Sequence, residues 1–215
     1  MDPALRAAAV AAKGFMPPDE GDALHAVALA AARAHPGLPL VEVGSYCGRS
    51  TVWLGAAARE AGTALFTVDH HRGSEENQPG WQWHDPSLVD EDTRRIDTLP
   101  YLRHALADAG LETTVSVVVG TTQQVATWWR TPVSLLFLDG NHTEATAQFD
   151  FAAFAPHVIE GGLLAVHDVF PDPRDGGQPP WHVVQRAMRN EAFVEQAQHG
   201  SLRVLRRTAK PIDLS

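Results

Sequence analysis

Residues Leu40–Thr51 read LVEVGSYCGRST: a short apolar run, a turn with two glycines, and the beginning of a helix that continues to about Ala61. Glycine at positions 44 and 48 permits backbone angles and close approaches that a side chain would block. A turn from a strand into a helix also presents unpaired backbone N–H groups, which bind polar or anionic groups of a ligand. The segment therefore predicts a binding site for a small, nucleotide-like molecule.

Apolar runs and helical patterns alternate along the rest of the chain. Strands are predicted at 39–44, 64–69, 114–119, 133–139 and 162–168, and helices at 49–61, 91–109, 123–130, 142–155 and 182–190. Near-continuous apolar strands between helices indicate a parallel sheet that is buried on both faces. Right-handed crossovers then give an open, doubly wound α/β sheet. Segments 192–198 and 202–207 predict a strand pair at the C-terminal end.

The composition limits the class of protein. The chain has 215 residues, of which 44% are hydrophobic and 20% charged, and this suits a single domain over residues 1–215. A net charge of −9 argues against binding to nucleic acid or to an anionic membrane, because both need a basic surface. The sequence has no apolar run that spans a bilayer and no signal-peptide pattern, so we expect a cytoplasmic protein. A single cysteine, Cys47, excludes an internal disulfide.

The carboxyl ends of the predicted parallel strands carry glycine or aspartate. Open doubly wound sheets bind their ligands in the crevice beyond these ends. We therefore expect one crevice to be lined by the following residues: Gly44, Asp69, Gly120, Asp139 and Asp168.

The glycine spacing separates two kinds of nucleotide site. The pattern Glu42-x-Gly44-x-x-x-Gly48 lacks the first glycine of the Gly-x-Gly-x-x-Gly fingerprint of dinucleotide-binding folds. It resembles motif one of the class I S-adenosylmethionine-dependent methyltransferases. That resemblance implies a Rossmann-like, mostly parallel seven-stranded sheet with a reversed C-terminal strand. It also implies that Asp69 binds the ribose and that the segment after residue 119 surrounds adenine. The donor-binding residues it implies are Glu42, Gly44, Ser45, Gly48, Ser50, Asp69, Gly120, Thr121, Thr122, Gln123 and Asp139.

Two further segments, Asp139-Gly140-Asn141-His142 and His167-Asp168, follow adjacent strands. Two carboxylates at close range repel each other unless a cation lies between them, and oxygen ligands suit Mg²⁺ or Mn²⁺. The segments resemble the cation-dependent O-methyltransferases, although His167 departs from their acidic or amide pair. The predicted metal ligands are Asp139, His167 and Asp168, and the predicted catalytic residues are His142, Asp139 and His167. His142 is the first choice for the general base, with His167 as a third ligand or the alternative base. The simpler alternatives are that the two aspartates cap helices or loops, and that His142 is structural.

The acceptor is predicted with less detail. Residues 70–90 form a long polar insertion that we expect to act as a lid, since loops of this length are usually binding elements. The candidate substrate-binding residues in it are His70, His71, Trp81 and Trp83, although the tryptophans could instead pack on the sheet edge. The short length and the His-Asp segment resemble actinobacterial enzymes that methylate sugars. A sugar or oligosaccharide, including a methylated mannoside of polysaccharide biosynthesis, is therefore the expected acceptor.

Several alternatives stay open from the sequence. The acceptor could be a natural-product phenol or a macrolide sugar. From other classes, the chain could be a nicotinamide-dependent oxidoreductase or a non-catalytic carbohydrate-binding protein. Residues 1–36 predict an N-terminal helical extension that could cover the pocket, lie on the sheet edge or form a homodimer contact.

Overall fold

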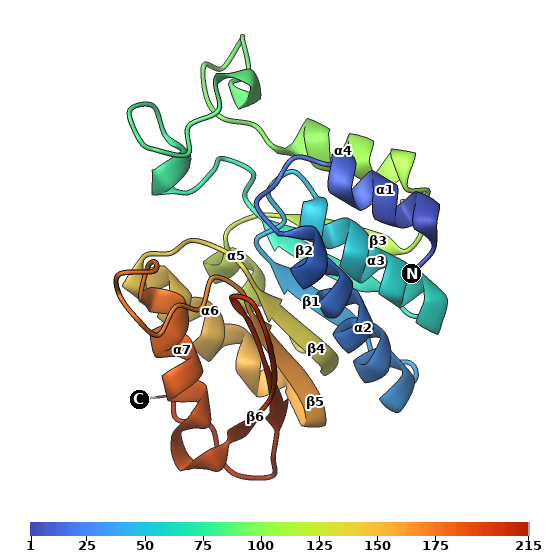
Figure 1. Cartoon of the computed structure of the whole chain (residues 1–215), viewed down its shortest axis with the longest axis vertical. Helices are drawn as coiled ribbons and strands as arrows, with labels where there is room; N and C mark the ends of the chain where they lie inside the picture. The colour runs from blue at the N-terminus through green and yellow to red at the C-terminus, as the bar shows by residue number, and fades with distance from the viewer. Residues whose placement is uncertain (215) are drawn as a thin grey trace.

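A single seven-stranded sheet organises the molecule (Figure 1). The computed structural model describes residues 1–214. The strand order is β3-β2-β1-β4-β5-β7-β6; the first five strands are parallel, and β7 runs antiparallel to both of its neighbours. This confirms the predicted doubly wound sheet with a reversed C-terminal strand. The strands are β1 (Leu40–Val43), β2 (Leu65–Asp69), β3 (Val115–Val119), β4 (Val133–Leu138), β5 (Val158–Val166), β6 (Phe193–His199) and β7 (Leu202–Arg207).

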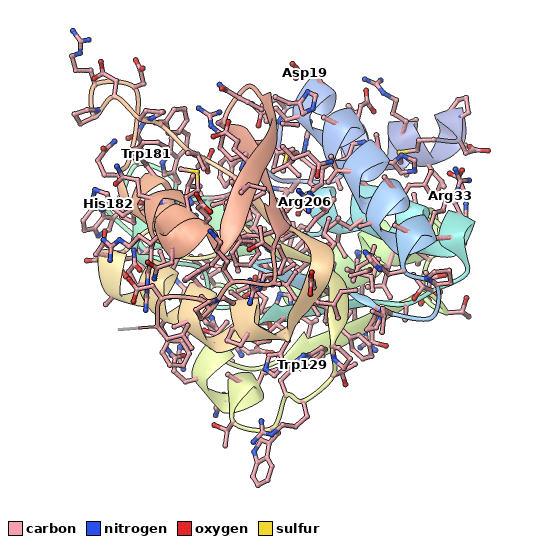
Figure 2. All side chains as sticks on the ribbon, turned by 90° about the horizontal axis from the view of Figure 1, so that it is seen from below. Asp19, Arg33, Trp129, Trp181, His182 and Arg206 are labelled. Atoms are coloured by element: carbon pink, nitrogen blue, oxygen red, sulfur yellow. The ribbon has the colours of Figure 1, made fainter. Side chains whose placement is uncertain are left out.

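Helices cover both faces of the sheet. One layer consists of α1 (Pro3–Ala11), α2 (Pro18–Ala34), α3 (Arg49–Ala61) and α4 (Leu99–Asp108). The other consists of α5 (Thr122–Ala126), α6 (Glu144–Phe154) and α7 (Pro179–Met188). Figure 2 shows the two layers from below: α2 runs from Asp19 to Arg33 on one side, and Trp181 and His182 mark α7 on the other. Short 3-10 segments lie at Glu75–Asn77, Pro86–Leu88, Ala155–His157 and Arg189–Glu191.

The central strands form the core because they are apolar on both faces. Every residue of β1 and β4 is buried, as expected for strands between two helical layers. Trp53 of α3 and Phe137 of β4 fill one side, and Phe151 and Phe154 of α6 fill the other; all four are at most 1% exposed. Among the described residues, no helix is both long enough and apolar enough to cross a membrane.

The helix predicted over 91–109 is wrong in its first half. α4 begins at Leu99, and residues 91–98 form a turn and a loop. Pro100 lacks an N–H and is tolerated only in the first turn of a helix, so it marks the start of α4 and not an interruption. Asp90 stabilises the loop, because its Oδ1 accepts hydrogen bonds from both the N–H and the hydroxyl of Thr93, each at 2.7 Å.

The segment between β2 and α4, residues 70–98, projects beyond the carboxyl end of the sheet (Figure 1). Side chains connect it to the body of the protein. Lys13 Nζ lies 2.6 Å from Asp85 Oδ2, and the Tyr101 hydroxyl donates to the Ser87 carbonyl at 2.5 Å. The projecting segment therefore contacts both the chain just after α1 and the helix α4.

Candidate active site

The turn after β1 brings the ends of β1 and β4 into contact. Gly44 has φ of +93°, and a Cβ at this position would lie 2.1 Å from the Asp139 carbonyl oxygen. No side chain fits such an approach, so glycine is required here both for the positive φ and for the close contact with Asp139. Gly48 also has a positive φ, +96°, and forms the N-cap of α3. The two glycines therefore fix where the turn, the helix and Asp139 meet.

Glu42 lies beneath this turn and is fully buried. The hydroxyls of Ser50, Thr51 and Thr67 donate to its carboxylate at 2.6, 2.6 and 2.7 Å. Burial raises the pKa of Glu42 to about 7, although the three hydrogen bonds oppose the shift. Glu42 joins β1, β2 and the first turn of α3, and its side chain does not line the cavity described below.

Asp69, at the end of β2, holds the turn from the other side. Its Oδ2 accepts the Tyr46 N–H at 2.8 Å, and its Oδ1 accepts the His71 N–H at 2.7 Å. A carboxylate has about four lone-pair sites, so two remain for a ligand after these bonds. Asp69 therefore fixes both the glycine turn and the beginning of the 70–98 segment.

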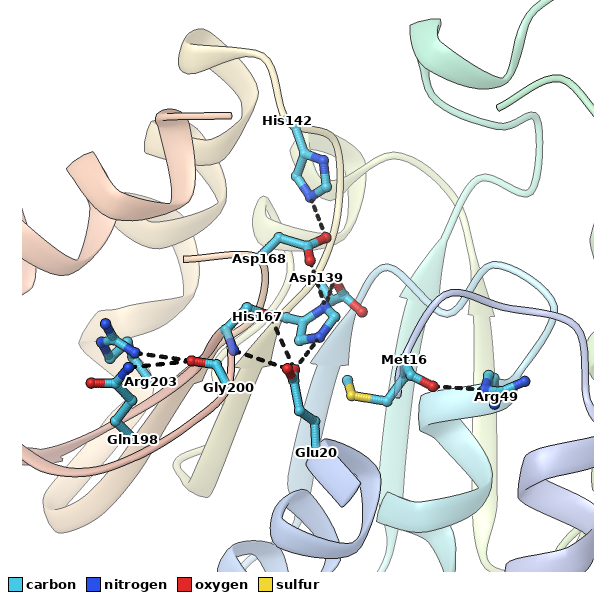
Figure 3. Close-up of polar contacts among 11 residues, drawn as sticks. Met16, Glu20, Arg49, Asp139, His142, His167, Asp168, Gln198, Gly200 and Arg203 are labelled. Carbon is cyan, nitrogen blue, oxygen red and sulfur yellow. Dashed lines mark hydrogen bonds and ion pairs between the residues drawn. The ribbon is translucent and has the colours of Figure 1, made fainter. Parts of the chain in front are cut away.

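Arg49 attaches the N-terminal segment to the same region. From the first turn of α3 its guanidinium donates to the carbonyls of Val10 at 3.0 Å and Ala12 at 3.2 Å. It also donates to the Met16 carbonyl at 2.8 Å (Figure 3). The side chain also stacks over the ring of Trp53. These contacts place residues 13–16 along one wall of the site.

A cavity of about 730 Å³ lies beyond the carboxyl ends of the strands. This volume is in the range of pockets that hold cofactors and small substrates. Eleven of the predicted site residues line it: Gly44, Ser45, Ser50, Asp69, His70, Trp83, Gly120, Thr122, Asp139, His142 and Asp168. The others lie outside its lining: Glu42, Gly48, His71, Trp81, Thr121, Gln123 and His167. The structure thus brings most of the strand-end residues together around one space.

Asp139, His142 and Asp168 form a cluster on one side of the cavity. One potential ligand atom from each lies within 4.8 Å of the other two. His142 Nε2 is 3.5 Å from Asp168 Oδ2, and among the described residues this buried nitrogen has no hydrogen-bond partner. A buried, unpaired imidazole nitrogen beside two carboxylates suits a divalent cation, because Mn²⁺ accepts this mixed set of nitrogen and oxygen ligands. The residues present therefore fit a metal ion.

His167, predicted as the third ligand, faces different partners (Figure 3). Its Nε2 lies 2.8 Å from Glu20 Oε2, and its Nδ1 lies 3.1 Å from Asp139 Oδ1 and 3.4 Å from Asp168 Oδ1. Burial alone would lower the pKa of His167, but the charge of Asp139 and the hydrogen bonds to the three carboxylates raise it to about 12. In this arrangement His167 lies between three carboxylates, and His142 is the histidine that faces the cavity.

Three residues around the site were not predicted from the sequence. Glu20 contacts His167, Asp150 of α6 lines the cavity, and Phe15 forms part of its rim. Burial raises the pKa of Asp150 to about 6 despite the Thr122 hydroxyl beside it, and its Oδ1 has no partner among residues 1–214. A signal was available for the first two: each acid lies on the buried face of its helix, at helical spacing from Leu24 and Phe154 respectively.

The order of these features along the chain agrees with one family of enzymes. Residues 41–169 match the model of the methyltransferase domain family. The chain belongs to this family, and the predicted class I methyltransferase fold and enzyme class are confirmed.

Solved structures with the same fold include three O-methyltransferases. The O-methyltransferase NovP is 16% identical, covers 89% of this chain and 80% of its own, and superposes with a TM-score of 0.68. The Bacillus cereus O-methyltransferase, solved with SAH (S-adenosylhomocysteine), is 17% identical over 96% of this chain and 92% of its own, with a TM-score of 0.63. TomG of Streptomyces achromogenes, involved in tomaymycin synthesis and solved with SAM (S-adenosylmethionine), is 17% identical. It covers 97% of this chain and 91% of its own, also with a TM-score of 0.63. At these identities the likeness concerns the fold.

Proposed function

We propose that this protein transfers the methyl group of S-adenosylmethionine to a hydroxyl of a small polar acceptor, and that it uses a divalent cation, Mg²⁺ or Mn²⁺. The observation that carries the proposal is the cluster of Asp139, His142 and Asp168 beside the Gly44 turn, within one cavity. The turn and Asp69 would hold the donor, and the cluster would hold the acceptor end. The family match gives no support to the nicotinamide-dependent alternative.

Methyl transfer is a displacement in which the acceptor oxygen must lie in line with the departing sulfur. The residues of this chain contribute mainly by positioning, which supplies a large part of the rate enhancement in such reactions. Asp139, Asp168 and His142 would hold the cation, and a cation so bound lowers the pKa of an acceptor hydroxyl next to it. With the cation bound, His142 would serve as a ligand, and the hydroxyl proton would then pass to solvent water and not to His142.

The acceptor we propose is a sugar. Trp83 and Phe15 lie at the cavity and are 47% and 56% exposed, and their rings pack edge to face with centroids 5.4 Å apart. Exposed aromatic faces with polar neighbours can stack on a sugar ring while the polar groups bind its hydroxyls. The neighbouring polar residues include His70, Glu76, Gln82 and Asn141. A natural-product phenol fits the same aromatic faces and is the second candidate.

A methyl-transfer screen with labelled donor tests the proposal. The acceptors are methylated mannosides, other sugars and catechols, each with Mg²⁺, with Mn²⁺ and with EDTA. We expect transfer to a sugar that EDTA abolishes and that Asp139→Asn lowers by about 100-fold or more, since removing one charged ligand weakens both cation binding and activity. Full activity in EDTA would remove the cation from the mechanism and make His142 the general base; His142→Gln would then abolish transfer. Activity on catechols alone would exclude the sugar.

A further inference from the structure

Glu20 lies in the first turn of α2 and is buried beside the active site (Figure 3). Its Oε1 accepts the Ser201 N–H at 2.9 Å. Its Oε2 accepts the Ser201 hydroxyl at 3.0 Å and faces His167 Nε2 at 2.8 Å. Hydrogen bonds to a carboxylate are among the stronger ones in proteins, and three of them fix this side chain in one orientation.

One connection runs from Glu20 through His167 to both aspartates. The imidazole ring is rigid, so a partner that fixes Nε2 also fixes the direction of Nδ1. That nitrogen lies 3.1 Å from Asp139 Oδ1 and 3.4 Å from Asp168 Oδ1. Each aspartate therefore turns one carboxylate oxygen, its Oδ1, toward His167. Asp168 directs its other oxygen, Oδ2, toward His142 at 3.5 Å.

A second connection reaches Asp168 through the backbone. The Ser201 carbonyl accepts the Val169 N–H at 3.0 Å, so the β6–β7 turn holds the residue directly after Asp168. Asp168 has a left-handed backbone with φ of +53°, which is unfavourable for a residue with a side chain. Such a conformation persists only where the surroundings fix it on both sides. Here the neighbours are His167, whose side chain Glu20 contacts directly, and Val169, which Glu20 reaches through Ser201.

The β6–β7 turn itself is shaped around the carboxylate. Gly200 has φ of +56°, and a Cβ at this position would lie 2.1 Å from Glu20 Oε1. The side chains of Gln198 and Arg203 both donate to the Gly200 carbonyl, each at 3.3 Å, and brace the turn (Figure 3). The carboxylate of Glu20 therefore enters a prepared space and is not an incidental surface contact.

We infer that Glu20 is a positioning residue of this enzyme: through His167 and Ser201 it holds Asp139 and Asp168 in the arrangement that the reaction requires. The role of these two aspartates is the one proposed above, and the inference rests on it. An acidic residue of the N-terminal extension thereby supports the site from outside, since Glu20 does not line the cavity.

The test compares Glu20→Gln with Glu60→Gln in the full-length protein. Glutamine keeps the shape of glutamate, but its NH₂ group cannot accept a hydrogen bond. In either orientation it faces a donor, the Ser201 N–H at one position or the Ser201 hydroxyl and His167 at the other, so at least one of the three hydrogen bonds is lost. Glu60 of α3 is a matched control, because it lies 3.7 Å from His25 Nε2 and so also pairs with a histidine, one carried by α2 itself, away from the cavity. Ser201→Ala is a milder variant that removes one of the three donors.

Three quantities are measured: kcat on the acceptor found in the screen, Kd for Mn²⁺ by electron paramagnetic resonance titration, and Kd for SAH by calorimetry. For Glu20→Gln we expect kcat to fall and the Mn²⁺ Kd to rise by about 10- to 100-fold, as for other residues that orient metal ligands. Ser201→Ala changes the same two quantities in the same direction, by less. The SAH Kd stays within about 2-fold of wild type, and Glu60→Gln matches wild type throughout.

Wild-type kcat and Mn²⁺ Kd in Glu20→Gln overturn the inference, and so does a loss of SAH affinity as large as the loss of kcat, because that indicates general damage to the fold. If Glu20→Gln does not fold, Ser201→Ala decides by the same criteria. The proposed cation is tested separately by wild-type activity in EDTA. Should that activity persist, the ratio of kcat between Glu20→Gln and Glu60→Gln still decides the role of Glu20.

Discussion

The two sides of the cavity are built in different ways. On the proposed donor side, Gly44 and Asp69 lie at or just after the ends of β1 and β2, so the register of the sheet sets their positions. On the proposed acceptor side, Phe15 and Trp83 belong to irregular segments that side chains hold together. Backbone ladders leave little freedom, whereas isolated side-chain contacts are individually weak. A substitution on the donor side should therefore abolish donor binding and lower stability, whereas a substitution on the acceptor side should change acceptor binding by a small amount.

The largest expected effect is that of Gly44→Ala on the donor side. The new Cβ would collide with the Asp139 backbone and would also require an unfavourable φ. Backbone strain and overpacking together should lower the free energy of unfolding by about 4 kcal/mol and abolish measurable SAH binding. Urea denaturation and calorimetry measure the two quantities.

Gly37→Ala is the matched control for this change. Gly37 also has a positive φ, +85°, but a Cβ added there would meet no atom within 4 Å, so only the strain remains. We expect a loss of about 1 kcal/mol and normal SAH binding. Equal effects of the two substitutions would contradict the requirement for close contact between β1 and β4.

The next effect concerns Asp150, whose pKa is raised to about 6 by burial. An acid with a raised folded pKa is protonated in both states below about pH 4, and it favours the unfolded state increasingly as the pH rises to about 6. Asp150→Asn removes this cost, so the variant should exceed wild type in the free energy of unfolding by about 2 to 3 kcal/mol above pH 6 relative to pH 4. The measurement is urea denaturation of the ligand-free protein at several pH values. The exposed Asp92→Asn is the surface control for these measurements.

A smaller effect is expected on the acceptor side. Trp83→Ala removes one aromatic wall and should raise the KM for the acceptor by about 5- to 10-fold, with little change in SAH affinity. Trp81→Ala is the matched control, since Trp81 is 53% exposed and lies outside the lining of the cavity. Steady-state kinetics at saturating donor measure both variants. An equal rise in KM for the two would place the acceptor elsewhere on the 70–98 segment.

The smallest effect is that of Lys13→Gln. The ion pair of Lys13 with Asp85 joins the N-terminal segment to the projecting segment, but its two side chains are 42% and 37% exposed. Such a pair contributes about 0 to 1 kcal/mol and is screened by salt. We expect a slight rise in acceptor KM at about 0.05 M salt that disappears near 1 M. A rise that persists at high salt would mean that Lys13 binds the acceptor directly.

The wrong start of α4 and the residues missed near the site share one cause: the tertiary contacts that decide them are not visible in the local sequence. Pro100 is equally compatible with the first turn of a helix and with a kink inside it, and the sequence does not state which one the fold uses. Glu20 carried a visible signal, an acid on an otherwise apolar helix face with Leu24 and Ala28. Its partners His167 and Ser201, however, are distant in the sequence and meet it only after α2 packs near the ends of β5 and β7.

By itself, the sequence determined where the strands lie along the chain, the two-glycine turn and the meeting of Gly44, Asp69, Asp139 and Asp168. These are consequences of local apolar patterns and of the rule that parallel strands end at one edge of a sheet. Only the tertiary structure decided that His142 faces the cavity while His167 lies between carboxylates, because two histidines next to strand ends have the same local pattern. Glu20 contacts His167, and no periodicity in the sequence connects α2 to the ends of β4 and β5.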